Sequence, residues 1–211
     1  MVRATEKSEP ILTFRSSAKF EAYMSAEPRT SDGCWLKLSK AGAARPTITK
    51  QEAIEAALCC GWIDGQLSPL DTEYFLVRMT PRRRGSRWSQ KNRDAADQLL
   101  TQGRIRPAGI AEIEAAKGDG RWARAYASQG KAEVPADLVA ALTRKKSAAA
   151  FFEELDRANR YAIIYRVNDA KRPETRAERI TKFVAMLARG ETLHPRKAGA
   201  SAVTAKRGKR G

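Results

Sequence analysis

Residues 59–93 constrain the fold of this chain more than any other stretch of its sequence. They read CCGWIDGQLSPLDTEYFLVRMTPRRRGSRWSQKNR. Strict alternation of side-chain character over residues 74–80 predicts a β-strand with two different faces. Phe75, Val77 and Met79 share one face of this strand. The other face carries Tyr74, Leu76, Arg78 and Thr80. An Arg on a half-apolar face requires a partner, because an unpaired buried charge is costly.

Turn signals place this strand in a small sheet. Asp64-Gly65 and Pro69 suit turns, which leaves Trp62 and Ile63 as a short strand and favours a hairpin with residues 74–80. Further strands are predicted at residues 11–14 and 34–38. So few strands, joined by so short a turn, argue against an all-parallel sheet.

Helical signals flank the sheet and fill the C-terminal part of the chain. Thr49 and Glu52 have capping-box spacing and open a helix that Gly61 ends. Other helices are predicted at 17–26, 89–102 and 107–117, and then at 135–144, 147–155, 157–170 and 173–189. The predicted class is α+β: a small, mostly antiparallel sheet with flanking helices in residues 11–130, followed by a helical module in residues 131–194.

Charge and composition bound the functional classes. The formal net charge is +16, and residues 195–211 contribute +6 of it without any acid, which predicts a disordered basic tail. Residues 1–10 are predicted to be a flexible N-terminus. The basic balance favours anionic partners: nucleic acid, anionic lipid headgroups or phosphorylated small molecules. The alternative is that the surplus arginines only solvate the surface.

Several features are not expected. No apolar run is long enough for a membrane span, and the N-terminus lacks the apolar region of a secretory signal, so the chain is predicted to be cytoplasmic. The cysteines, three in number, have no metal-ligand spacing and there is one histidine. We therefore expect no metal site and no cofactor.

The first candidate site is a cleft at the sheet that binds an anionic or planar ligand. Arginines hold phosphate or carboxylate, and tryptophans stack. The residues assigned to it are Trp62, Asp64, Tyr74, Arg78, Arg82, Trp88 and Asn92. The competing interpretation is structural: Asp64 pairs with Arg78 to fix the hairpin, with Glu73 and Asp71 as further candidate partners.

The second candidate is the basic loop of residues 82–87, which contributes Arg82, Arg83, Arg84 and Arg87. The loop runs into a helix N-terminus, where backbone N–H groups and the helix dipole favour an anion. It lacks the spacing of a P-loop, so nucleotide hydrolysis is not indicated.

The third candidate is a basic helix face formed by Arg172, Arg176 and Arg179. These positions recur at i, i+4 and i+7. Glu174 and Glu178 lie within one turn of them, so ion pairing on a solvated face is the alternative.

Three segments carry a family resemblance: GAARPTITKQEAIEAALCCGWIDGQ, RMTPRRRGSRWSQKN and AKRPETRAERITKFVAMLARG. Together they resemble the YdeI/OmpD-associated family, also called bacteriocin-protection proteins, over about residues 10–195. Cys60 departs from the pattern, because the family is expected to have an aromatic residue before GWIDG. The resemblance implies a bacteriocin-protection or stress-response role rather than a particular reaction.

Three functional hypotheses follow. The leading one is a non-enzymatic cytoplasmic protection protein that binds an anionic ligand through the Trp/Asp/Arg cleft and the basic loop. The second is nonspecific nucleic-acid binding by the basic surface. The third is an enzyme in which Asp64 acts as general base and Arg78 orients the substrate, which requires a cleft around Asp64.

Overall fold

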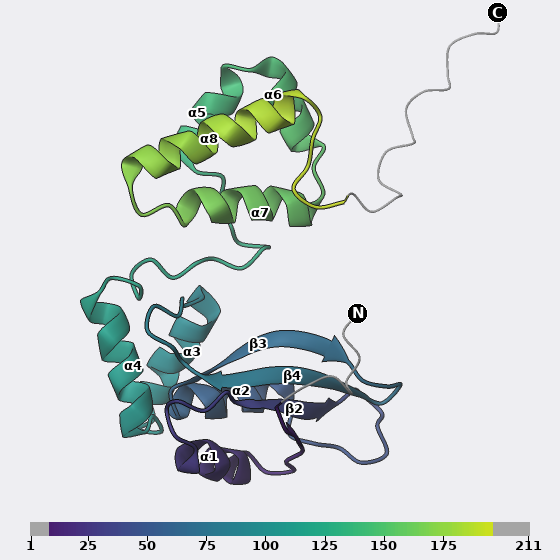
Figure 1. Ribbon diagram of the computed structural model, residues 1–211, viewed down its shortest axis with the longest axis vertical. Coiled ribbons are helices and arrows are strands. Elements are labelled where there is room, and N and C mark those ends of the chain that lie inside the picture. Colours follow the sequence, from purple (N-terminus) through teal and green to yellow (C-terminus); the bar gives the residue numbers. More distant parts are fainter. Residues whose placement is uncertain (1–8, 196–211) are drawn as a thin grey trace, which may run out of the picture. The chain divides into compact units, whose positions relative to one another are not determined.

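The computed structural model describes residues 9–195, which form two compact units that divide between Ala125 and Tyr126 (Figure 1). The predicted boundary after residue 130 lies five residues further along. The predicted flexible N-terminus and basic tail fall almost wholly on residues 1–8 and 196–211, outside the described residues. The α+β class is confirmed.

The N-terminal unit contains a four-stranded sheet in the order β1-β2-β4-β3. Its elements are β1 (Ile11–Leu12), α1 (Ser17–Ala26), β2 (Cys34–Ser39), α2 (Lys50–Cys59), β3 (Trp62–Pro69), β4 (Tyr74–Pro81), α3 (Gln90–Thr101) and α4 (Pro107–Gly118). β4 is antiparallel to both of its neighbours, and β1 is parallel to β2. The prediction of a mostly antiparallel sheet is therefore confirmed.

Local sequence explains where α2 begins and ends. The Thr49 hydroxyl accepts from the Glu52 backbone N–H, and the Glu52 carboxylate accepts from the Thr49 N–H, so the predicted capping box is present. Gly61 follows the helix with φ +72°, a backbone conformation that residues other than glycine rarely adopt. The chain then turns directly into β3.

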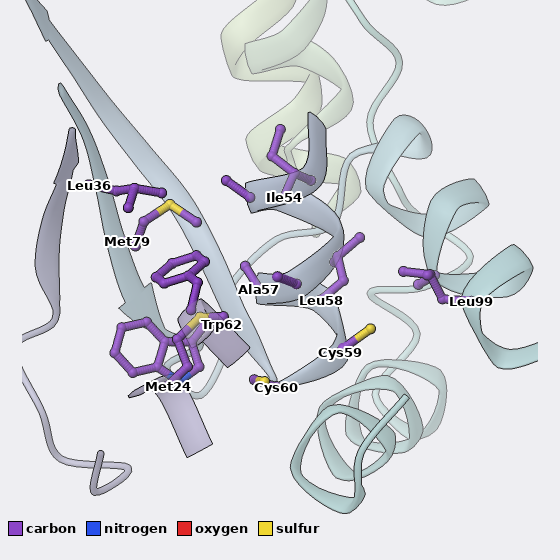
Figure 2. Close-up of a cluster of buried hydrophobic side chains, with 14 of the residues drawn as sticks. Met24, Leu36, Ile54, Ala57, Leu58, Cys59, Cys60, Trp62, Met79 and Leu99 are labelled. Carbon is purple, nitrogen blue, oxygen red and sulfur yellow. The ribbon is translucent and has the colours of Figure 1, made fainter. Parts of the chain in front are cut away.

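The core of the N-terminal unit lies on one face of the sheet. Register places Leu36 opposite Val77 and Cys34 opposite Met79, and these side chains belong to one buried cluster with residues of α1, α2, α3 and α4. Figure 2 shows α2 between the sheet, which contributes Leu36 and Met79, and α3, which contributes Leu99. All four helices therefore contribute to the core on this face, and the predicted face assignment of the central strand is correct.

The hairpin differs from the prediction. β3 continues through Asp64 to Pro69, and its register with β4 shifts between Asp64 and Leu67. Asp64-Gly65 is thus part of the strand beside an irregularity, not the hairpin turn. The turn falls at residues 70–73, where the Asp71 carboxylate accepts from the N–H groups of Glu73 and Tyr74.

Gly109 fixes how closely α4 approaches the end of α2. A Cβ at this position would lie 2.6 Å from the Cys59 carbonyl oxygen and 2.7 Å from that of Leu58. Alanine gains about 1 kcal/mol over glycine in a helix, but overpacking typically costs about 1–3 kcal/mol. We therefore expect Gly109→Ala to lower the free energy of unfolding by up to about 2 kcal/mol, measured by denaturant unfolding.

Gly118 supplies the matched control in the same helix. A Cβ there meets no atom within 4 Å, so Gly118→Ala should raise the free energy of unfolding by about 0.5 kcal/mol through helix propensity alone. If both variants are stabilised, the close approach at Gly109 is not a constraint.

The C-terminal unit is helical. Its helices are α5 (Ala136–Thr143), α6 (Lys146–Glu153), α7 (Arg157–Asn168) and α8 (Pro173–Ala188). They enclose a separate core that includes Leu138, Phe152, Ile163 and Leu187. Each unit therefore has its own buried apolar cluster. Among residues 9–195, no helix has the length and apolar character needed to cross a bilayer.

Candidate functional site

The basic loop of residues 82–87 leaves the sheet at the end of β4 and is closed by local hydrogen bonds. The Ser86 N–H donates to the Arg83 carbonyl at 2.9 Å, and the Arg83 N–H donates to the Ser86 hydroxyl at 3.0 Å. Gly85 has φ +84°, as the third position of a type II turn requires. The loop is therefore a defined turn rather than an open connection.

Arginines from elsewhere hold the two ends of this turn. Arg29 donates to the Arg82 and Gly61 carbonyls, both at 3.1 Å, and also pairs with Glu112. Arg121 donates to the Ser86 carbonyl at 2.7 Å while its Nε lies 2.7 Å from the Asp119 carboxylate. Neither Arg29 nor Arg121 was assigned to the site from the sequence, because each lies more than 30 residues from its carbonyl partner in the loop.

A stack of cationic and aromatic groups lies beneath the turn. The Arg82 guanidinium is 3.6 Å from the ring centroid of Trp88, and Trp88 packs edge-on against Trp122 at 4.7 Å. Arg82 is 3% exposed and also donates to the Arg87 carbonyl at 3.2 Å. Cation–π contact of a desolvated Arg contributes about 2 kcal/mol, so Arg82 acts as the anchor of the loop.

The other cations of the loop face solvent. Arg83, Arg84 and Arg87 are exposed, and so is Lys91 in the first turn of α3. Arg83 lies 3.7 Å from Asp32, but both side chains are more than three-quarters exposed, and such pairs contribute little. Residues 82–93 carry six Lys or Arg residues and no acid. The site is thus a fixed, strongly positive turn that leads into α3.

The N-terminus of α3 is partly satisfied by its own cap. The Ser89 hydroxyl accepts from the Asn92 backbone N–H at 3.1 Å. Asn92 is half-buried, and it contributes to this cap with its backbone N–H group. The indole N–H of Trp88, which is 2% exposed, has no hydrogen-bond partner within residues 9–195. A buried donor without an acceptor is rare and calls for an explanation.

The predicted cleft is not assembled. Trp62 is 2% exposed and packs in the core, with its ring 6.3 Å from that of Tyr23. Asp64 lies opposite Met79 in the ladder, so its side chain and that of Arg78 leave opposite faces of the sheet. The expected Asp64–Arg78 pair is therefore wrong, and with it the geometry of an Asp64 general base oriented by Arg78.

Arg78 has a different partner. Its guanidinium forms an ion pair with Glu9 and donates to the Asp32 carbonyl at 2.8 Å. The other two predicted partners bond elsewhere, since Glu73 accepts from the Ala44 N–H and Asp71 caps the turn before β4.

Tyr74 lies at the opposite end of β4 from the basic loop. Eight residues of strand place it about 26 Å from Arg82. Its hydroxyl donates to the Arg45 carbonyl at 3.1 Å. Of the residues assigned to the cleft, the structure brings together Arg82, Trp88 and the backbone of Asn92, and it disperses the other four.

In the C-terminal unit, the three arginines predicted to form a basic helix face do not form a uniform surface, and Arg172 is the N-cap of α8 rather than part of it. Arg176 binds both oxygens of Asp137 and donates to the Val167 carbonyl, and Arg179 lies 3.6 Å from Asp169. Arg172 is exposed. The ion-pairing alternative was right in kind for two of the three, but the partners come from α5 and the end of α7 rather than from Glu174 and Glu178.

No set of three or more His, Cys, Asp or Glu side chains in the described part of the chain is placed to hold a metal ion. The thiols are buried and free. Burial raises the pKa of Cys34 to about 12 and that of Cys59 to about 11, so neither offers a thiolate ligand near neutral pH.

Fold and site together define a two-part protein in which an α+β unit with a rigid arginine turn precedes a helical unit. Residues 131–190, which lie within the C-terminal unit, match the family model "Bacteriocin-protection, YdeI or OmpD-Associated". Residues 12–112 match a second model, described as "Domain of unknown function (DUF8412)". No curated protein and no solved structure matches the chain.

These matches divide the segments that carry the resemblance between two family models. Of the three segments that suggested it, the C-terminal one lies in the match to the bacteriocin-protection family. The other two lie within residues 12–112, which match the model without an assigned function. The arginine turn therefore belongs to the part of the chain about which the family name says nothing.

Proposed function

We propose that this protein is a non-enzymatic, cytoplasmic protection protein of the bacteriocin-protection type that binds a phosphate-bearing polyanion through its arginine turn. The family match of the C-terminal unit supports the protective role. The charge and rigidity of residues 82–93 support the ligand class.

The observation that carries the proposal is the separation of roles among the arginines of the turn. Arg82 is buried against Trp88 and fixes the loop, whereas Arg83, Arg84 and Arg87 extend into solvent. A turn that is already ordered loses little entropy on binding, so more of the electrostatic attraction contributes to affinity. Exposed arginines on such a turn suit phosphate oxygens, which guanidinium groups bind in a forked geometry.

The alternatives have less support. An enzyme that uses Asp64 as general base lacks its orienting arginine, because Arg78 leaves the other face of the sheet. Nucleic acid remains one member of the class of phosphate-bearing polyanions. Competition with inorganic polyphosphate separates nucleic acid from a ligand that is recognised by charge alone.

Neutralising the exposed arginines tests the proposal. The triple variant Arg83→Gln, Arg84→Gln, Arg87→Gln should weaken binding of a labelled single-stranded oligonucleotide at low salt by at least tenfold. It should also reduce the slope of log K against log salt by about 2, since each lost phosphate contact contributes about 0.7. Fluorescence anisotropy over a series of salt concentrations measures both quantities.

An equal change of charge elsewhere is the control. Arg144, Lys145 and Lys146 are three consecutive exposed cations where α5 leads into α6, and Lys146 is the first residue of α6. Their replacement by Gln also lowers the formal charge by three. This variant should bind nearly as the parent does. Equal loss in both variants, or no salt-dependent binding by the parent, would refute a site at the arginine turn.

Inorganic polyphosphate then distinguishes the ligands. If it displaces the oligonucleotide at equal phosphate concentration, recognition is of charge alone. If it does not, the nucleic-acid alternative is favoured.

A further inference from the structure

The sheet of the N-terminal unit has a second face, opposite the one that packs against the helices. Register places Trp35 opposite Arg78 and Lys37 opposite Leu76 on this face. The Lys37 ammonium lies 3.9 Å from the centroid of the Tyr74 ring, and the Arg78 guanidinium lies 6.0 Å from that of Trp35. Cationic side chains therefore lie across aromatic ones here.

One carboxylate joins two of these residues. Oε1 of Glu9 accepts from the Arg78 guanidinium, and Oε2 of Glu9 accepts from the Trp35 indole N–H at 3.2 Å. Arg78 is held in place by its second bond, to the Asp32 carbonyl. Two fixed donors from different strands thus converge on the two oxygens of a planar carboxylate, which is the geometry of carboxylate recognition.

The pKa of Glu9 is consistent with this arrangement. Partial burial pushes the pKa of the carboxyl group upward, but its hydrogen bonds to its own backbone N–H, to Arg78 and to Trp35, together with the charge of Arg78, hold that pKa below its usual value. The donors therefore favour the ionised form.

Glu9 itself is attached through few contacts. It precedes β1, which is two residues long and pairs with β2 at Ile11 and Leu12. The Pro10 carbonyl accepts from the Trp35 N–H at 2.9 Å. The donors, by contrast, lie on β2 and β4, the two central strands of the sheet, and Arg78 has a second bond, to the Asp32 carbonyl, that does not involve Glu9.

We propose that Arg78 and Trp35 form a carboxylate-binding site that Glu9 fills in the free protein and that a carboxylate of another molecule takes when Glu9 is withdrawn. This site is independent of the arginine turn and of the function proposed for it. An internal carboxylate that fills the site more than about 90% of the time weakens binding of an external one by about tenfold or more.

Acetate is the minimal probe, and the indole N–H resonance of Trp35 in a ¹H–¹⁵N spectrum of the full chain is the readout, assigned with Trp35→Phe. At constant ionic strength, Glu9→Ala should show a saturable shift with an apparent Kd for acetate at least tenfold lower than that of the parent. The double variant Glu9→Ala, Arg78→Gln should show no saturable shift.

Glu9→Gln serves as a second variant, since it keeps an oxygen for the indole N–H and removes the charge. It too should bind acetate more tightly than the parent does. The proposal is overturned if parent and both Glu9 variants respond alike, or if the shift survives the loss of Arg78.

Two short peptides identify the source of the carboxylate. One is blocked at both ends and carries a single Glu, and the other carries Gln in its place and has a free C-terminus. Whichever shifts the Trp35 resonance of Glu9→Ala identifies the ligand as an acidic side chain or a chain terminus. If neither peptide does so, the site does not accept an external carboxylate of a polypeptide and the proposal fails.

Discussion

Replacing Trp62 with alanine is expected to lower the free energy of unfolding of the N-terminal unit by about 3–5 kcal/mol, the usual cost of truncating a large buried aromatic side chain. Trp62 is 2% exposed and is among the largest fully buried side chains. It lies close to Met24 and within the cluster that joins the sheet to α2 (Figure 2). Denaturant unfolding followed by far-UV circular dichroism and by the fluorescence of the remaining tryptophans measures the loss.

Asp64 is the matched control two residues along the same strand. Its side chain is half-exposed and makes no hydrogen bond or ion pair with a described residue, so Asp64→Ala should change the free energy of unfolding by less than about 0.5 kcal/mol. A ligand-binding cleft predicts the reverse, with Trp62 exposed and dispensable for stability. A loss below about 1 kcal/mol for Trp62→Ala would contradict its place in the core.

The sequence predicts which residues of β4 share a face, but not what Arg78 contacts. Alternation along residues 74–80 is a local property, and it groups Val77 with Met79, which both lie in the core. The partner of Arg78 is Glu9, which lies 69 residues away and meets it through β1 and β2. No rule of local spacing selects such a partner. The structural interpretation expected Arg78 to pair with a carboxylate, and it does. The carboxylate belongs to Glu9 rather than to Asp64.

The misplaced hairpin turn has a different physical cause. Asp-Gly is a strong turn signal because both residues tolerate unusual backbone angles. Gly65 has no positive φ here and lies in β3 where the register shifts. The residues from Leu70 to Glu73 form the turn instead, and Asp71 closes it with its side chain. If the pairing of Pro69 with Phe75 continued without a shift, Asp64 would lie opposite Thr80, on the same face as Arg78. The shift between Asp64 and Leu67 places Asp64 opposite Met79 instead, so it cannot meet Arg78.

The basic loop, in contrast, was visible in the sequence because its arginines are consecutive. Pro81 and Gly85 bracket a run of arginines, and exposure of Arg83 and Arg84 follows from the cost of burying so much charge. What the sequence did not reveal is the support of the loop. Arg29 lies in the segment after α1, and Arg121 lies in the segment after α4. Only the tertiary structure brings these two side chains to the carbonyl groups of the loop.

The second large effect is expected at Asn159 in the C-terminal unit, a residue that periodicity alone does not distinguish. Asn159 is fully buried, and its amide donates to the Asp156 carboxylate and the His194 carbonyl while its oxygen accepts from the His194 N–H. It therefore ties the segment after α8 to the first turn of α7. Asn159→Ala leaves buried groups without partners and should cost about 2–4 kcal/mol.

The distribution of tryptophan makes this effect measurable within the full chain. All four tryptophans, at positions 35, 62, 88 and 122, precede the division at Ala125. Because each unit has its own core, Asn159→Ala should lower the midpoint of the helical transition seen by circular dichroism and leave the tryptophan fluorescence transition in place. A shift of both transitions by the same amount would mean that the units unfold together.

Two further variants isolate the hydrogen bonds from shape and from the identity of residue 194. Asn159→Asp preserves the shape of the side chain, but it replaces a donor by a second carboxylate beside Asp156, so it should destabilise the unit at neutral pH at least as much as alanine does. His194→Ala should change the free energy of unfolding by less than about 0.5 kcal/mol, because His194 takes part through its backbone atoms alone. If His194→Ala is as costly as Asn159→Ala, the imidazole and not the backbone makes the contact. If Asn159→Asp is harmless, packing rather than hydrogen bonding accounts for the role of Asn159.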